Sequence, residues 1–300
     1  MSLLVVGSIA LDSIENHHGK VHDVLGGSAV YSSVSASFLY DNVSIIGVVG
    51  QDFPKKHVEL LEKHGVNTSA LHFADGKTFR WRGRYVNLNQ AITLETHLNV
   101  FEKFNPIIPD DLRDSPFVLL GNIDPEIQLN VISQMRKPKI IAADTMNYWI
   151  IKKLDKLIEM FKHIDILFIN DEEIRLLTQE HYLYDAYQKI LTYGPKIVVV
   201  KKGEHGVMVV KKDFYFFAPG YPLKKVLDTT GAGDCFSGGF MGYLASCKTL
   251  DDKTLKQAAI MGTITSAFDV EGFSLDALTK LSKEKIKSRF DKLKNYTQFE

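Results

Sequence analysis

Short apolar runs of strand length alternate with longer amphipathic segments along most of the chain. The predicted strands are Leu3–Ile9, Val43–Val49, Phe117–Leu120, Lys139–Ala143, Ile164–Ile169 and Ile197–Lys201. The segments with helical periodicity are Ser28–Tyr40, Pro54–His64, Glu126–Met135, Lys152–Phe161, Glu172–Leu177 and Leu183–Leu191. Nearly continuous apolar strands separated by helices favour an α/β fold with a doubly wound, mainly parallel sheet flanked by helices on both faces.

The pattern changes after Lys201. Val207–Val210 and Asp213–Ala218 are predicted to form antiparallel strands around a charged turn. The last predicted helices are Asp234–Ser246, Thr254–Phe268 and Ser274–Lys292. Because no repeat or low-complexity linker divides the chain, we predict a single domain over residues 1–300.

One segment interrupts the α/β rhythm with alternating aromatic and basic side chains. As a strand it would carry Phe79, Trp81 and Tyr85 on one face. We predict a small β lid inserted at about residues 75–101, continuing through Ala91–Phe101. The alternative is an antiparallel edge extension packed on the main body. Pairing of the aromatic face with a second copy would give a homodimer, whereas a lid that only covers substrate is compatible with a monomer.

Composition narrows the class of partner. The chain has 36 basic and 36 acidic residues, so no overall field favours nucleic acid or an anionic membrane. No stretch of about eighteen apolar residues predicts a membrane span, and the first residues lack the basic segment of a signal peptide. Cys235 and Cys247 are poorly placed to pair on one predicted helix. We therefore expect a soluble cytoplasmic protein.

The strongest chemical signal is Asp228–Asp234, a glycine-rich string directly before a small-residue helix. Gly231 and Gly233 allow a tight turn and close approach of a ligand to the backbone. Free N–H groups at the start of the following helix would bind a phosphate or a developing oxyanion. Asp234 in the first turn is placed to take a proton from a substrate hydroxyl. The alternative for such a string alone is a turn with an acidic helix cap.

The full string resembles the second signature of the PfkB family of ribokinase-like carbohydrate kinases, and further motifs of that family follow in order over nearly the whole chain. The resemblance implies a ribokinase-like fold and ATP-dependent transfer of phosphate to a hydroxymethyl group. It assigns Gly231, Ala232 and Gly233 to the anion hole and Asp234 to the catalytic base.

The resemblance also assigns the acceptor side. Gly26 and Gly27, before a small-residue helix, are similar to the N-terminal sugar-binding glycine pair of the family. Asp12 is similar to the early aspartate that holds substrate hydroxyls. A lone aspartate in a turn is more often structural, but its pairing with the two glycines favours substrate binding.

On the nucleotide side, Asn170 and Glu173 match an Asn-x-x-Glu element associated with magnesium and phosphate. Glu173 is expected to hold Mg²⁺ through water, since this ion takes oxygen ligands and keeps several waters. The same spacing is that of a helix capping box, and both roles are compatible. Lys201, Gly203 and Gly206 match the strand-end glycine motif beside the nucleotide, although the glycines alone would indicate a β-hairpin.

The implied cofactors are ATP and Mg²⁺. Thr230 is assigned to the nucleotide side of the loop. Asp228 is similar to the carboxylate that helps to hold a monovalent cation in some relatives, together with the far segment Ala267–Ser274. The resemblance therefore allows potassium dependence without requiring it.

Departures from the family pattern fall at the acceptor site. Tyr31 stands where sugar kinases of the family often carry asparagine, and its ring would either stack on substrate or fill space. Asp144 retains the acid of an Asp-Pro-Asn element whose asparagine is displaced. Asn122 follows another strand end and would contact substrate or shape a turn. A ribose- or fructose-like sugar is the expected acceptor, with a nucleoside as the alternative.

The sequence disfavours two other function classes. A ligand-binding relative without catalysis is disfavoured because Asp234, the glycine loop, Asn170 and Glu173 are all present. A dinucleotide oxidoreductase is disfavoured because Gly7 is not followed by the Gly-x-Gly-x-x-Gly fingerprint.

Overall fold

A computed structural model describes residues 2–87 and 91–298. Its centre is a large sheet whose strands, from one edge to the other, are β14 (Phe214–Ala218), β13 (Val207–Lys211), β12 (Ile197–Lys201), β11 (Ile166–Asn170), β10 (Ile140–Asp144), β9 (Phe117–Leu120), β1 (Leu3–Val6), β4 (Val43–Gly50) and β5 (Val66–Asn67), with β6 (Leu71–Ala74) also paired to β4. Neighbours from β12 to β5 run parallel, while β13 and β14 add an antiparallel edge. The predicted doubly wound, mainly parallel sheet is confirmed.

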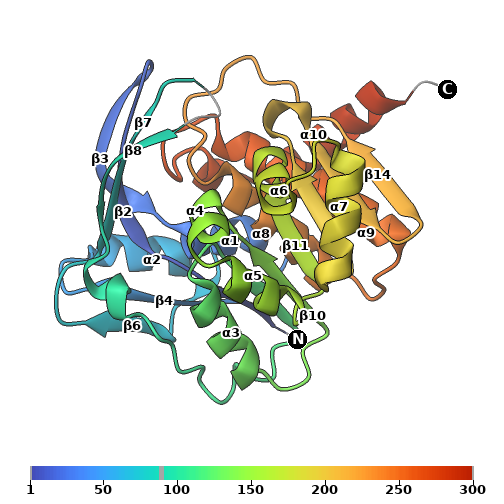
Figure 1. Cartoon of the computed structure of the whole chain (residues 1–300). Coiled ribbons are helices and arrows are strands. Elements are labelled where there is room, and N and C mark those ends of the chain that lie inside the picture. The colour runs from blue at the N-terminus through green and yellow to red at the C-terminus, as the bar shows by residue number, and fades with distance from the viewer. Residues whose placement is uncertain (1, 88–90, 299–300) are drawn as a thin grey trace.

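Helices cover both faces of this sheet (Figure 1). One layer contains α1 (Ser28–Ser37), α2 (Lys55–Lys63), α8 (Ala232–Ser246), α9 (Asp252–Asp269) and α10 (Lys283–Thr297). The other contains α3 (Pro125–Gln134), α4 (Asn147–Lys152), α5 (Leu154–Phe161), α6 (Asp171–Thr178) and α7 (Leu183–Tyr193). Short 3₁₀ helices are η1 (Asn99–Lys103), η2 (Gly203–His205) and η3 (Leu278–Lys280).

The central strands are buried on both sides, so their side chains supply two separate cores. In β1, Leu3 and Val5 belong to the core under α1 and α8, and Leu4 and Val6 to the core under α3 and α5. This division follows from the period of two along a strand. It explains why the strand sequences are apolar without alternation.

A second, smaller sheet projects from one side of the body (Figure 1); it contains the segment predicted as a lid, and that name is kept for the whole sheet. Its strands are, in order, β3 (Gly19–Gly26), β2 (Ala10–Asn16), β7 (Phe79–Tyr85) and β8 (Ala91–His97). The predicted segment therefore supplies β7 and β8, while residues 88–90 of it lie outside the described part of the chain. Strand β8 is exposed along its length, and a dimer through the lid stays a prediction.

The sequence pattern did not predict the other two strands of the lid, β2 and β3. The first strand was expected to continue to Ile9, but β1 ends at Val6 and the lid begins at Ala10. Hydrogen bonds fix this break: the Ser28 N–H donates to Ser8 Oγ at 3.0 Å, and the Ser8 N–H donates to Ser28 Oγ at 3.1 Å. These bonds tie the exit of β1 to the start of α1 and direct the intervening hairpin away from the main sheet.

Candidate active site

Helix α8 begins at the glycine-rich loop that was predicted to bind phosphate. Gly231, directly before the helix, has φ of 79°, and a Cβ there would lie 2.5 Å from the Tyr31 ring. The left-handed backbone and the close ring together require glycine. Ala232 opens the helix, and the N–H groups of Gly233 and Asp234 find no acceptor among the described residues. Free amides at the positive end of a helix form an anion site.

The segment before α8 is held by the lid and by the C-terminal region. Asp228 accepts the Thr230 N–H at 3.0 Å and the Ser274 N–H at 3.3 Å. The Thr230 hydroxyl donates to Tyr85 Oη at 3.0 Å. Tyr85 belongs to β7, and burial raises its pKa to about 12, so the phenol stays protonated. Tyr85 was predicted on the aromatic face of the lid but not as part of the site.

Helix α1 packs directly against the first turn of α8. The Ser32 hydroxyl donates to Asp234 O at 3.0 Å, and the Ser35 hydroxyl donates to Cys235 O at 2.6 Å. These side chains satisfy carbonyl groups of α8 and fix its start relative to the N-terminal region. The position of Asp234 is therefore set by a helix about 200 residues earlier in the chain.

The Asp234 side chain is half-buried beside the free amides, and no hydrogen bond or ion pair to its carboxylate is present among the described residues. Burial and, next, the charge of Asp144 raise the pKa of Asp234 to about 7, against the lowering effect of Lys201. A carboxylate with this pKa is matched to proton abstraction near neutral pH. Its free oxygens are available to a substrate hydroxyl.

Lys201 and Asp144 meet next to the loop. Lys201 Nζ lies 2.6 Å from Asp144 Oδ2, with side chains 17% and 5% exposed. The two residues end the parallel strands β12 and β10, and polar groups at such carboxyl ends gather at one edge of the sheet. A Cβ on Gly233 would lie 3.0 Å from Lys201 Nζ. Asp144 was predicted on the acceptor side, but its side chain pairs with the residue predicted for the nucleotide.

Asn170 and Glu173 form the capping box that their spacing allowed. Asn170 Oδ1 accepts the Glu173 N–H at 2.7 Å, and Glu173 Oε2 accepts the Asn170 N–H at 3.0 Å. Burial raises the pKa of Glu173 to about 7, while Lys201 lowers it. One Glu173 oxygen thus accepts a hydrogen bond in the helix cap, and the positive charge of Lys201 stabilises the ionised carboxylate.

The predicted acceptor residues lie together at the root of the lid. A Cβ on Gly26 would lie 1.9 Å from Asp12 Oδ2, so glycine is required for the Asp12 carboxyl to occupy its place. Gly27, with φ of 99°, precedes α1 directly. Burial, then the charges of Asp228 and Asp234, raise the pKa of Asp12 to about 8.

An aromatic residue of the lid is paired with Asp12 across the sheet. Trp81 is the register partner of Asp12 between β7 and β2, so both side chains stand on the same face. The indole N–H donates to Thr93 Oγ1 at 3.2 Å, and the ring lies over Gly83, where a Cβ would meet it at 2.1 Å. The strand alternation was the signal that identified this ring.

Tyr31 is buried beneath the glycine-rich loop. The residue is 1% exposed and its ring lies under Gly231. Burial and the charge of Asp269 raise its pKa well above the usual value. Of the two roles considered for this ring, the structure therefore shows packing beneath the anion loop.

Other predicted residues have structural partners. Asn122 Oδ1 accepts the Trp149 indole N–H at 3.0 Å, so this amide holds a ring of α4. Gly203 and Gly206 lie in the turn between the antiparallel strands β12 and β13, where a Cβ on Gly206 would meet Ala218 O at 2.0 Å. This is the hairpin that the glycines alone indicated.

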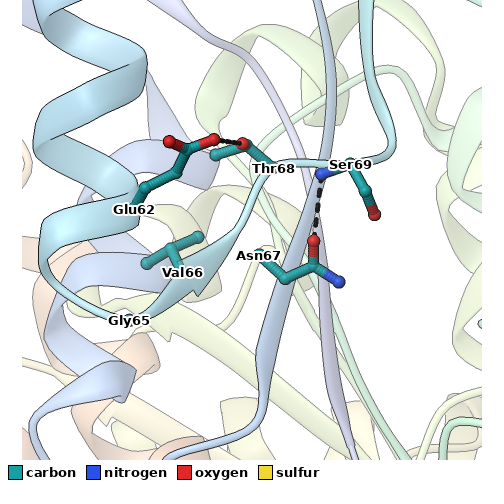
Figure 2. A pocket seen from close by; sticks show the side chains of 6 residues that line it. All are labelled: Glu62, Gly65, Val66, Asn67, Thr68 and Ser69. Carbon is teal, nitrogen blue, oxygen red and sulfur yellow. Dashed lines mark hydrogen bonds between the residues drawn. The ribbon is translucent and has the colours of Figure 1, made fainter.

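A surface pocket lies elsewhere, around the turn between α2 and β5 (Figure 2). Its hydrogen bonds join Thr68 to Glu62 of α2 and the Ser69 N–H to Asn67 of β5, so they link residues of this short segment only. Because none of its lining residues belongs to the predicted site, we assign it no part in the chemistry.

The residues at the loop fit a nucleotide polyphosphate. Free amides and the Lys201 ammonium lie side by side, and both bind phosphate oxygens. Within residues 2–87 and 91–298, no three or more His, Cys, Asp and Glu side chains are grouped so that they could hold a metal ion. Mg²⁺ in phosphoryl-transfer sites commonly uses few carboxylates together with substrate phosphates. Glu173 fits that role.

The chain matches known kinases over most of its length. The sequence model of the pfkB family carbohydrate kinases matches residues 2–280. A cytidine kinase from Thermococcus kodakarensis is 27% identical over 257 residues, which cover 84% of this chain and 91% of the relative. A nucleoside kinase from Methanocaldococcus jannaschii is 26% identical over 251 residues, covering 82% and 79%.

Solved structures share the fold. The structure of the Methanocaldococcus jannaschii nucleoside kinase, an archaeal member of the ribokinase family, has a TM-score of 0.78 at 23% identity and covers 97% of this chain and 99% of that chain. A Vibrio cholerae fructokinase with bound fructose, ADP and calcium has a TM-score of 0.80 at 18% identity, with the same coverage. The predicted ribokinase-like fold is confirmed.

Cys235 and Cys247 are both free thiols. No helix in the described ranges 2–87 and 91–298 is long and apolar enough to cross a membrane.

Proposed function

The chain belongs to the pfkB family of carbohydrate kinases and is a phosphotransferase acting on a sugar or nucleoside, and on that premise we propose that Asp234 activates a hydroxymethyl group to attack the terminal phosphate of ATP. The observation that carries this proposal is the half-buried Asp234 carboxylate beside the free amides of α8. Base and anion site are held in one helical turn, which brings together the groups that an in-line transfer requires.

In the proposed reaction, the Asp234 carboxylate accepts the proton of the acceptor hydroxyl. The acceptor oxygen forms a bond to the terminal phosphorus while the bond from phosphorus to the ADP oxygen breaks. The N–H groups of Gly233 and Asp234 donate to the phosphoryl oxygens, whose negative charge they stabilise. Asp12 holds the acceptor hydroxyls, and Gly26 provides the space for its carboxyl.

Glu173 would hold magnesium through water, and the ion would neutralise part of the charge on the phosphates. The dependence of activity on potassium should also be tested, because Asp228 lies against the Val270–Ser274 segment. The Leu227 N–H donates to Val270 O at 2.7 Å, and the Ser274 N–H donates to the Asp228 carboxylate. Both Asp228 oxygens already accept backbone N–H groups. A cation here would be held mainly by carbonyl oxygens.

We propose a nucleoside as the preferred acceptor. The matched cytidine and nucleoside kinases cover most of the chain, whereas the match to a probable fructokinase from Arabidopsis thaliana is confined to 38% of it. The pairing of Trp81 with Asp12 across the sheet supports this choice, since an aromatic ring on the face that carries a hydroxyl-binding carboxyl suits a ribose that carries a base. A ribose- or fructose-like sugar is the second candidate, because Asp12 alone would serve either.

The decisive experiment is a panel of nucleosides and sugars with ATP, magnesium and either potassium or sodium, read as ADP release. Cytidine and other nucleosides should turn over with a higher kcat/KM than ribose or fructose. Turnover of sugars alone would replace the acceptor assignment and leave the kinase chemistry intact. Tight binding of acceptor and ATP without ADP release would overturn the proposed transfer.

A further inference from the structure

The Lys201–Asp144 ion pair has a position that structural need alone does not explain. Replacing a buried ion pair with apolar side chains of similar size is often neutral or stabilising, so such pairs are weak evidence for a stabilising role. Lys201 ends β12 and Asp144 ends β10, and these two strands are separated in the sheet by β11. The Lys201 ammonium lies beside Gly233 of the anion site. The ammonium is therefore within reach of whatever anion the loop binds.

Two groups besides Lys201 can donate hydrogen bonds to the Asp144 carboxylate. Its Oδ1 accepts the Thr145 N–H at 2.9 Å, and its Oδ2 lies 3.2 Å from the Ser237 hydroxyl. Ser237 belongs to α8 and also reaches Gly233 O at 3.0 Å. If the lysine turned away, the single proton of the Ser237 hydroxyl could be directed to Asp144 Oδ2 while the Thr145 N–H still donates to Oδ1. Movement of the lysine would then not leave a buried carboxylate without hydrogen bonds.

Lys201 has anionic neighbours besides Asp144. The charges of Asp144, Glu173 and Asp234 raise its pKa against the lowering effect of burial, so the ammonium is charged at neutral pH. Its three N–H donors are carried on a flexible stem, and its one hydrogen bond described is to Asp144. Donors are thus left for a second anion on the Gly233 side.

We propose that Lys201 exchanges partners during the reaction, resting on Asp144 in the empty site and moving to the terminal phosphate of the nucleotide when it binds. This assignment rests on the proposed kinase chemistry and deepens it. Lys201 then acts as a catalytic residue that stabilises the transferred phosphoryl group. Asp144, predicted from sequence to contact the acceptor, becomes a positioning residue that holds the lysine ready.

The test compares affinities for ATP and AMP, measured by calorimetry with magnesium and without acceptor. Lys201→Met should weaken ATP binding by about tenfold or more while AMP binding stays unchanged, since AMP lacks the phosphates that Lys201 reaches. Its turnover should fall by about a hundredfold, as for loss of one donor to a transition-state anion. Lys201→Arg should recover part of both. Asp144→Asn should bind ATP severalfold more tightly, because the lysine no longer leaves an anionic partner.

Lys196→Met is a matched control. Lys196 lies just before the other end of the same strand, and its Nζ is 2.7 Å from Asp165 Oδ1. That variant should change neither affinity. If Lys201→Met does not fold, the double variant with Asp144→Asn removes both charges and permits the same comparison.

Equal losses of ATP and AMP affinity in Lys201→Met, or none, would overturn the exchange. An increase in acceptor KM in Asp144→Asn with unchanged ATP affinity would return Asp144 to the acceptor site. The proposal on function fails separately. If no acceptor turns over but the ATP-selective effect of Lys201 persists, only the transfer chemistry is wrong.

Discussion

The two flanks of helix α8 differ in whether a cation lies beside their buried carboxyl groups. On the acceptor flank (Asp12, Gly26 and Gly27), burial and the negative charges of Asp228 and Asp234 act together and raise the pKa of Asp12 to about 8. On the nucleotide flank (Lys201, Asp144 and Glu173), the lysine opposes burial and pairs with Asp144 at 2.6 Å. The start of α8 thus lies between the acceptor flank, whose three residues include no cation, and the nucleotide flank, which contains Lys201.

This difference would let one site bind a neutral acceptor on one flank and a polyanionic nucleotide on the other. A carboxyl that holds its proton at neutral pH both donates and accepts hydrogen bonds, which suits neutral hydroxyl groups. A lysine beside free amides suits a polyanion. Asp234 lies between the flanks, where the proton of one ligand must leave as the phosphate of the other arrives.

The largest effect is expected at Asp234, which serves both flanks. Asp234→Asn should lower kcat by about a thousandfold, the middle of the range for loss of a general base. The measurement is steady-state turnover, with thermal melting as the check on folding. Asp252→Asn, in the first turn of α9, is the matched control and should retain full activity. Turnover within a few fold of wild type would show that another group accepts the proton.

A steric change confined to the acceptor flank should be next in size. In Gly26→Ala the new Cβ would lie 1.9 Å from Asp12 Oδ2. Overpacking of this kind costs about 1–3 kcal/mol, so the acceptor KM should rise roughly tenfold to a hundredfold. ATP affinity measured without acceptor should stay constant. A parallel loss of ATP affinity would show that the two flanks are not independent.

The uncompensated carboxyl on the acceptor flank should also give stability a pH dependence. The pKa of Asp12 is about 8 in the folded protein, whereas the ordinary pKa of an aspartate is 3.8. Between these values the folded state binds more protons than the unfolded state, so the free energy of unfolding falls as pH rises. Asp12 contributes at most about 1.4 kcal/mol per pH unit.

Denaturant titrations between pH 5 and pH 8 measure this slope. Asp12→Asn, which has no proton to lose, should flatten it. A slope unchanged by that substitution would assign the pH dependence to other carboxyl groups, such as Glu173 on the nucleotide flank.

The smallest effect is expected where the lid meets the loop. Tyr85→Phe removes the oxygen that accepts the Thr230 hydroxyl at 3.0 Å. A net hydrogen bond contributes about 1 kcal/mol, so kcat/KM for the acceptor should fall roughly fivefold. Tyr215→Phe, which loses a bond from Gln188 at the far edge of the sheet, should have no effect. A comparable loss in that control would indicate a general effect of phenol removal.

Most of the main body could be predicted from the sequence because its signals are local. The apolar strands β9 and β12 were predicted with their observed bounds, since a buried strand is a short continuous apolar run. The glycine string before α8 likewise predicts its own backbone from φ requirements. Here residue type and neighbouring sequence determine the structure.

What was missed depends on contacts between distant residues. Strand β2 carries polar residues and pairs in parallel with β7, a partner far along the chain that no local period indicates. Asp144 and Lys201 are 57 residues apart and were assigned to different ligands, yet they form one ion pair. Tyr85 and Thr230 are 145 residues apart. In each case side-chain geometry at the meeting of elements decides the outcome.

The packing of α1 against the start of α8 has a consequence for synthesis of the protein. Ser32 and Ser35 find their acceptors on Asp234 and Cys235, and the Ser274 hydroxyl donates to Leu25 O at 2.5 Å. As the chain leaves the ribosome, the N-terminal quarter must wait for the C-terminal third before these bonds can form. The side chains of α1, nearly all of which are buried in the folded protein, lack these partners during that interval, so folding of the N-terminal region is expected to depend on completion of the C-terminal third.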